Sequence, residues 1–229
     1  MAIEVKHTKV STKAEGDDPS QVRTSDWNAA HTVTGMADVL GILAAQRRAG
    51  ATAPESWYTG LMCLGGLTTL AMTANRLYVH PFLVAKNQTA DRIAVCVTAA
   101  ASAGKKARLG IYKNANGYPG DLEADLGEVT VDATGLRMVT INKALAPGLW
   151  WLAVVVEEAA TVRALYHYYT LGIIGFPASG SPPSISYTSP TGYYMAHTYG
   201  ALPASFAAYA SATEITASAC PAVFLRFSS

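Results

Sequence analysis

The feature that most constrains the fold is a series of short segments, after residue 55, in which apolar and polar residues alternate. Turn-forming residues separate the segments, among them Asn116-Gly117 and Pro147-Gly148. A period of two is that of a β-strand, since successive side chains point to opposite faces of a sheet. Six such segments without helical segments between them predict an all-β fold, an antiparallel, jelly-roll-like β-sandwich. The predicted strands cover residues 77–85, 92–99, 107–113, 126–131, 136–141 and 149–156.

Two parts of the predicted sandwich domain, residues 55–229, depart from this alternation. Leu149–Val156 is apolar nearly throughout, which predicts a strand buried on both faces. Residues 160–221 hold eight of the twelve tyrosines between Gly-Ser-Pro segments. We expect them to form long loops that pack on the sandwich and return in a last strand at 222–227.

The first fifty residues have a different character. Residues 1–35 show no sustained period and predict an extended arm, in which Trp27 is a large aromatic without a surrounding core. Such a residue suits an anchor in a partner's pocket, although it could also pack on the helix that follows. Apolar residues at spacings of three and four predict that helix over 36–48. Residues 36–54 would then be a short helical stem and linker.

Charge is sparse and unevenly placed. Charged residues make up 14% of the chain and the net charge is +1, so bulk attraction to nucleic acid or an anionic membrane is not expected. No apolar run is long enough for membrane insertion, and no secretory signal is recognisable at the N-terminus. Residues 1–50 carry twelve charged side chains, whereas residues 170–229 carry two, Glu214 and Arg226. We expect part of this C-terminal surface to be covered by another chain.

The tyrosine-rich loops are the candidate binding region. Tyrosine offers a large amphipathic surface at low rotamer cost, and glycine and serine add adaptable hydrogen bonding. The candidate contact residues are Tyr187, Tyr193, Tyr194, Tyr199 and His197. In the alternative interpretation these tyrosines fill the sandwich and the seams between subunits, with their hydroxyls bonded to loop backbone.

Catalysis and metal binding are not expected. Four carboxylates, Asp121, Glu123, Asp125 and Glu128, lie within eight residues, but they lack the spacing of a calcium loop and alternate as a solvated face does. The tyrosine-rich region offers one carboxylate, Glu214, where a glycosidase needs two. Cys63, Cys96 and Cys220 show no metal-ligand spacing, so free thiols are expected. The sequence therefore predicts a protein without enzymatic activity and without a cofactor.

Several short motifs of this chain are distinctive. The N-terminal arm contains the turn Gly16-Asp17-Asp18-Pro19-Ser20 and the element Ser25-Asp26-Trp27-Asn28-Ala29-Ala30-His31. The predicted sandwich contains Asn75-Arg76-Leu77-Tyr78, Pro81-Phe82, Ala107-Arg108-Leu109-Gly110-Ile111-Tyr112, Gly117-Tyr118-Pro119-Gly120 and Leu145-Ala146-Pro147-Gly148-Leu149-Trp150-Trp151-Leu152-Ala153. In these motifs the arm resembles the N-terminal segment of tailed-bacteriophage virion proteins, and the sandwich resembles the β-sandwich domains of phage fibre, spike and tail-appendage proteins.

The resemblance implies a fibre or spike appendage of the virion, assembled in the host cytoplasm, often as a homotrimer. Asp26, Trp27, Asn28 and His31 would dock the arm on capsid, portal or tail proteins, and the sandwich would contact a host-surface glycan or protein. Two alternatives remain open. One is a decoration or joining protein of capsid or tail without receptor binding, and the other is a carbohydrate-binding module.

Overall fold

The chain divides into two compact units, residues 1–42 and 43–229. A computed structural model describes residues 57–60, 66–84, 86–166, 190–208, 211–216 and 219–228, and the backbone of two short strands before them. These are β1 (Glu4–Val5) and β2 (His31–Thr32), which pair antiparallel with Glu4 opposite Thr32. The predicted helix at 36–48 lies outside the described residues.

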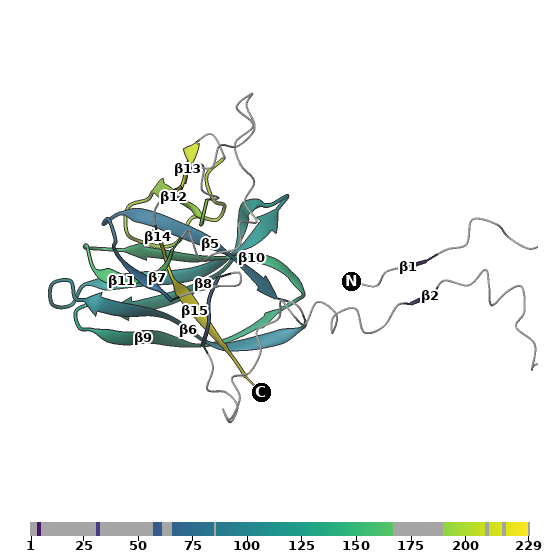
Figure 1. Ribbon diagram of the computed structural model, residues 1–229, viewed down its shortest axis with the longest axis horizontal. Coiled ribbons are helices and arrows are strands. Elements are labelled where there is room, and N and C mark those ends of the chain that lie inside the picture. The colour runs from purple at the N-terminus through teal and green to yellow at the C-terminus, as the bar shows by residue number, and fades with distance from the viewer. Residues whose placement is uncertain are drawn as a thin grey trace, which may run out of the picture. The chain divides into compact units, whose positions relative to one another are not determined.

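The second unit is built from two antiparallel sheets, which confirms the predicted all-β fold (Figure 1). The six-stranded sheet has the order β13-β12-β5-β10-β7-β8. In the seven-stranded sheet, β14-β11-β6-β15-β3 form the main path, β4 pairs with β11, and β9 pairs with β6. The described residues contain no α-helix, and none of their segments is a helix that could cross a membrane.

Each sheet combines long strands with strands of two to four residues. The six-stranded sheet contains β5 (Arg76–Val84), β7 (Lys106–Ala115), β8 (Tyr118–Thr130), β10 (Gly148–Val156), β12 (Tyr193–Ala196) and β13 (Thr213–Glu214). The seven-stranded sheet contains β3 (Trp57–Tyr58), β4 (Thr68–Ala71), β6 (Gln88–Ala99), β9 (Gly135–Leu145), β11 (Thr161–Tyr166), β14 (Ala219–Pro221) and β15 (Val223–Phe227).

All six strands predicted between residues 77 and 156 are present, and so is the last strand, β15. The expectation that residues 160–221 are loops is wrong in part. This region contains β11, which pairs with β4, β6 and β14, and β12, which extends the other sheet beside β5. Because the strands that pair with β11 and β12 are distant in sequence, the local pattern of residues did not predict these two strands.

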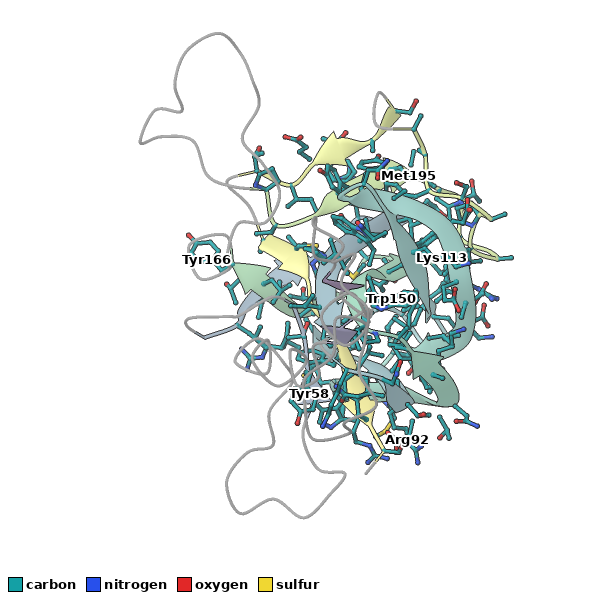
Figure 2. All side chains as sticks on the ribbon, turned by 90° about the vertical axis from the view of Figure 1, so that its right-hand side faces the viewer. Tyr58, Arg92, Lys113, Trp150, Tyr166 and Met195 are labelled. Atoms are coloured by element: carbon teal, nitrogen blue, oxygen red, sulfur yellow. The ribbon has the colours of Figure 1, made fainter. Side chains whose placement is uncertain are left out.

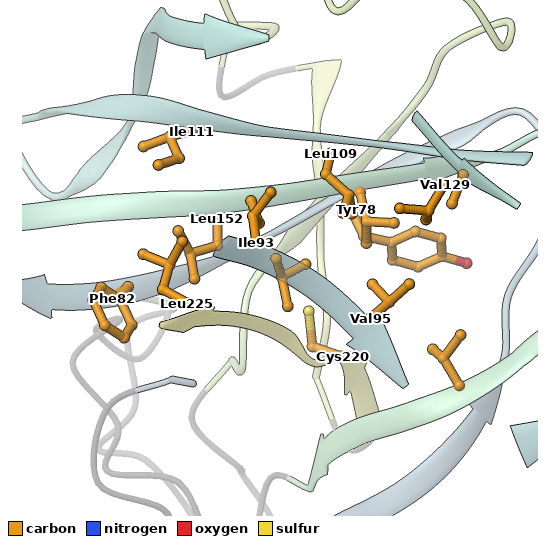
Figure 3. Packing of buried hydrophobic residues seen from close by; sticks show 14 of the residues in the cluster. Tyr78, Phe82, Ile93, Val95, Leu109, Ile111, Val129, Leu152, Cys220 and Leu225 are labelled. Atoms are coloured by element: carbon orange, nitrogen blue, oxygen red, sulfur yellow. The ribbon is translucent and has the colours of Figure 1, made fainter. Parts of the chain in front are cut away.

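The predicted two-sided burial of β10 is also confirmed. Its even-numbered residues Leu152, Val154 and Val156 belong to the main core between the sheets, together with residues such as Ile93 and Leu225 of the opposite sheet (Figure 3). Its odd-numbered residues Trp151, Ala153 and Val155 belong to a second cluster, which the six-stranded sheet shares with residues 193–206. Both faces of this sheet are therefore covered by apolar side chains.

Candidate functional site

Four of the five predicted contact residues lie where the chain leaves the six-stranded sheet. Tyr193 and Tyr194 are in β12, opposite Val79 and Tyr78 of β5. His197 and Tyr199 belong to the next segment, residues 197–208, which we call the strap. Tyr187 lies outside the described residues. β12 and the strap therefore bring together Tyr193, Tyr194, His197 and Tyr199.

The rings of the two β12 tyrosines pack within the chain. Tyr193 is 4% exposed, and its ring centroid lies 4.9 Å from that of Tyr118 and 5.6 Å from that of Trp151. Tyr194 is half-buried, and its ring centroid is 5.8 Å from that of Tyr78. The guanidinium carbon of Arg76 lies 4.2 Å from the Tyr194 ring centroid, a cation–π contact. Both tyrosines thus help to hold β12 against the sheet.

The strap crosses the outer face of the six-stranded sheet and reaches its edge strand β8. It starts where the His197 N–H donates to the carbonyl of Asn75, at 3.0 Å. At the far edge, the Leu122 N–H donates to the Ala204 carbonyl at 2.8 Å, and the Phe206 N–H donates to the Gly120 carbonyl at 2.9 Å. The strap therefore satisfies part of the open backbone edge of β8.

Two tyrosine hydroxyls of the sheet fix the strap from below. Tyr112 donates to the Pro203 carbonyl at 3.0 Å, and Tyr118 donates to the Ala207 carbonyl, also at 3.0 Å. Leu202 and Phe206 are both 5% exposed and complete the second apolar cluster. Burial raises the pKa of the Tyr112 phenol, so this hydroxyl stays protonated and remains a donor.

Gly110 of β7 makes room for the strap. A Cβ atom at this position would lie 2.2 Å from Cδ1 of Leu202 and 2.8 Å from the carbonyl oxygen of Ala124. Neither distance is possible for real atoms, so any side chain here would displace Leu202 or the neighbouring strand. A glycine inside a strand is a known sign of close approach by another segment, and this signal was present in the sequence.

A charged network anchors the middle of the strap. Arg108 donates to both oxygens of Asp125, at 3.1 and 3.0 Å, and to Oε1 of Glu128 at 2.8 Å. The same two carboxylates hold the strap. Oδ2 of Asp125 accepts from the Leu202 N–H at 3.0 Å, and Oε1 of Glu128 accepts from the Tyr199 hydroxyl at 2.9 Å. Hydrogen bonds from Lys106 and Tyr199 lower the pKa of Glu128, which keeps it ionised.

The acidic segment considered for calcium is largely engaged in ion pairs. Glu123 is paired with Lys143 and with Lys113, and Asp125 and Glu128 are paired with Arg108. Within the described ranges, no three His, Cys, Asp or Glu side chains are grouped so that they could hold a metal ion. These carboxylates serve to join β8 to β7, β9 and the strap.

The last residue of β12 and the first residues of the strap form a short rim, residues 196–201, which faces solvent. Ala196, Thr198 and Ala201 are exposed, whereas His197, Tyr199 and Gly200 are half-buried. His197 Nε2 lies 3.2 Å from the Ala201 carbonyl, which holds the imidazole over the loop. The rim offers the His197 ring and the Thr198 hydroxyl, in a conformation that the buried side of the strap fixes.

The predicted docking residues of the N-terminal unit are a separate group. Asp26, Trp27 and Asn28 lie outside the described residues. His31 lies in β2, opposite Val5 of β1. The pairing of β1 with β2 links the two ends of the predicted arm, a contact that the absence of any period in residues 1–30 did not suggest.

No protein-family model and no curated protein sequence matches this chain. One solved structure that matches contains the cysteine protease and lectin-like domains of Cwp84, a surface layer associated protein of Clostridium difficile. The match has a TM-score of 0.39 and 14% sequence identity, and it covers 68% of this chain and 33% of that chain.

Proposed function

We propose that the chain is a structural component of a bacteriophage particle. In this role it is a fibre- or spike-type appendage that docks through residues 1–35 and presents the β-sandwich to a host-surface glycan or protein. The observation that carries the proposal is the division of the chain near residue 42 into two compact units. The boundary falls within the predicted stem, residues 36–54, between the proposed docking arm and the proposed sandwich domain, and in this way it supports the proposal.

The strap rim supports a contact role for the sandwich. Loops on a rigid scaffold are common binding surfaces, because the scaffold fixes the contact groups before binding. Here hydrogen bonds from Tyr112, Tyr118 and Leu122 fix the strap to the sheet. His197 and Thr198 are then the side chains best placed to meet a partner, since the ring of Tyr193 faces inward.

A specific observation also favours the second candidate function, a decoration or joining protein of capsid or tail without receptor binding. The Tyr193 ring lies against Trp151 and Tyr118 of the same chain, and the Tyr199 hydroxyl is bonded to Glu128. These contacts are those of tyrosines that stabilise a fold. The two candidate functions share the docking arm and differ in whether the strap rim contacts the host.

Docking is tested by deleting residues 1–35 from the protein in infecting particles. We expect the truncated chain to accumulate in a folded form but to be missing from purified particles. Quantitative mass spectrometry of the particles, with circular dichroism of the free protein, measures both. A truncated chain that enters particles at the normal copy number would contradict docking through the arm.

Host contact is tested separately with the double variant His197→Ala/Thr198→Ala. If the rim binds the host, particles with a normal copy number should adsorb to cells at least about tenfold more slowly, as expected when a central contact is lost. Thr69→Ala, an exposed change on β4 of the other sheet, serves as the matched control. Unchanged adsorption of the double variant would favour the decoration or joining role.

A further inference from the structure

Among the residues that the structure describes, the exposed large hydrophobic side chains lie on one strand, β9. Among the described residues, the large hydrophobic side chains that are exposed are Leu136, 37% exposed, and Met138, 48% exposed. They are two positions apart in β9, so they point to the same face of the seven-stranded sheet. This face is the outer one, because Val139 and Ile141, at the alternate positions, pack against the main core.

The apolar surface continues from β9 onto the neighbouring strands. In the antiparallel register, Leu136 lies opposite Cys96 of β6, and Met138 lies opposite Ala94. Ala94 in turn lies opposite Phe224 of β15. Ala94 and Phe224 belong to a separate apolar cluster on this face, against which the half-buried Cys96 packs. We call Leu136, Met138 and Cys96 the β9 strip.

No charged side chain interrupts the exposed row of β9. Beyond Leu136 and Met138 its exposed positions are Thr140, Asn142 and Ala144. The two cations of the strand occupy the alternate positions and are engaged. Arg137 donates to the carbonyls of Ala133 and Thr134, and Lys143 pairs with Glu123. The exposed residues on this face of β9 are therefore uncharged, and both cations of the strand are engaged by other groups.

β9 is also an edge strand. It pairs with β6, which leaves the backbone groups of its other side without a strand partner among the described residues. Proteins usually protect such edges with charged side chains, proline or bulges. β9 is 11 residues long and contains no proline, and its pairing with β6 shifts register only between Ala90 and Arg92, so neither a bulge nor a charge interrupts the exposed positions from Leu136 to Met138.

We propose that the β9 strip is a self-association surface, on which a second copy of this chain packs close to a rotation axis. Near such an axis a residue meets its own counterpart, so a charged residue there would be repelled by its copy. A neutral, apolar row avoids that repulsion. A strongly charged partner would instead require side chains of the opposite charge on this face of β9. The exposed residues of β9 on this face are all uncharged.

This surface is distinct from the strap rim. In Figure 2, Met195 of β12, beside the strap, and Arg92 of β6, which lies opposite Thr140 of β9, are labelled at opposite ends of the view. Self-association through the β9 strip would thus leave the rim accessible. The proposal does not depend on a role in a virion, because it concerns the association of the purified chain.

The test is sedimentation of the full-length chain over a range of concentrations, with Met138→Glu as the variant. We expect the wild-type chain to form dimers or trimers, and the charge of the variant to weaken association by more than about tenfold. Because Met138 is about half exposed, the variant should fold normally, and its thermal unfolding checks this. Thr69→Glu adds the same charge on β4, at another exposed site of the same sheet, and should leave association unchanged.

Amide hydrogen exchange of residues 135–145 gives a second readout. Protection of this strand should rise with concentration in the wild-type chain and in Thr69→Glu, but not in Met138→Glu. The proposal is overturned if the wild-type chain is monomeric at about 100 μM, or if Met138→Glu associates as tightly as the wild type. Protection that does not depend on concentration would show that another part of the same chain covers the strip, which would also overturn it.

Discussion

The imidazole of His80 in β5 is joined to the backbone of Val223 in β15, across the space between the two sheets. Nε2 of His80 accepts the Val223 N–H at 3.1 Å. Nε2 must therefore be unprotonated, so the ring proton is on Nδ1, which lies 3.2 Å from the Pro81 carbonyl. His80 is 1% exposed, and the bond supplies an acceptor for a backbone group in the interior.

This bond predicts a loss of stability in mild acid. Burial lowers the pKa of His80 from 6.5 to about 4, so the folded protein keeps the ring neutral where the unfolded chain takes up a proton. The free energy of unfolding should therefore fall as the pH drops from about 6.5 towards 4, by up to about 3 kcal/mol. Urea unfolding at a series of pH values measures the slope.

The matched variant is His80→Gln, which keeps a hydrogen-bonding side chain but cannot titrate. It should be less stable at neutral pH by about 1–3 kcal/mol and should show little pH dependence between 5 and 6.5. Paired carboxylates such as Asp91 and Glu123 also have lowered pKa values, but their stabilising effect is lost only when the pH falls below about 4.5. An equal slope in wild type and variant would contradict the assignment to His80.

Gly110→Ala tests the close approach of the strap to β7. The added methyl group would overlap Leu202 and the Ala124 carbonyl, so we expect a loss of about 1–3 kcal/mol in unfolding free energy. Gly66→Ala is the control, because a Cβ there has no neighbour within 4 Å and the control should change little. Equal stability of the two variants would show that the strap does not lie where described.

The two strap-side tyrosines should respond differently to substitution. Tyr193→Ala removes a buried ring beside Trp151 and should cost about 3 kcal/mol or more. Tyr199→Phe removes the hydrogen bond to Glu128 on a half-exposed side chain and should cost about 1 kcal/mol. Denaturant unfolding ranks them. The reverse order would mean that Tyr193 does not lie in the interior.

Asp125→Asn tests the anchor of the strap. The change removes the charge that faces Arg108 and weakens the acceptor of the Leu202 N–H, so we expect a loss of about 1–2 kcal/mol. Hydrogen exchange should also become faster at Leu202. Glu157→Gln breaks the more exposed pair with Lys105 and should leave this amide unchanged. Equal exchange at Leu202 in both variants would contradict the anchoring role.

The central strands could be predicted because their pattern reflects the side-chain contacts that they make. Strand β10 was recognised by an apolar run that needs a core on each side, and its two faces indeed meet two different clusters. β11 was missed although Arg163 alternates there with the buried residues Val162 and Ala164. The run is short, and the tyrosines that follow it obscured the period.

The site was harder to predict because its contacts are long-range. The sequence placed Tyr193 in a binding loop, but its burial comes from Trp151 and Tyr118, more than forty residues away. Asp125 was interpreted as a solvated side chain, since nothing local reveals that Arg108 and the Leu202 N–H converge on it. Gly110 was the one local signal of the strap.

The position of β15 has a consequence for how the protein folds. This strand lies between β6 and β3, and supplies Val223, Leu225 and Phe227 to the main core. The contacts that it makes with β5 and β6 span about 130 residues or more, and loops of that size close slowly. Until β15 enters, residues 90–95 of β6 lack their partner on that side and the His80 ring has no backbone donor. Folding should therefore be slow, with the insertion of β15 as a late step, and unfinished chains should depend on chaperones to avoid aggregation.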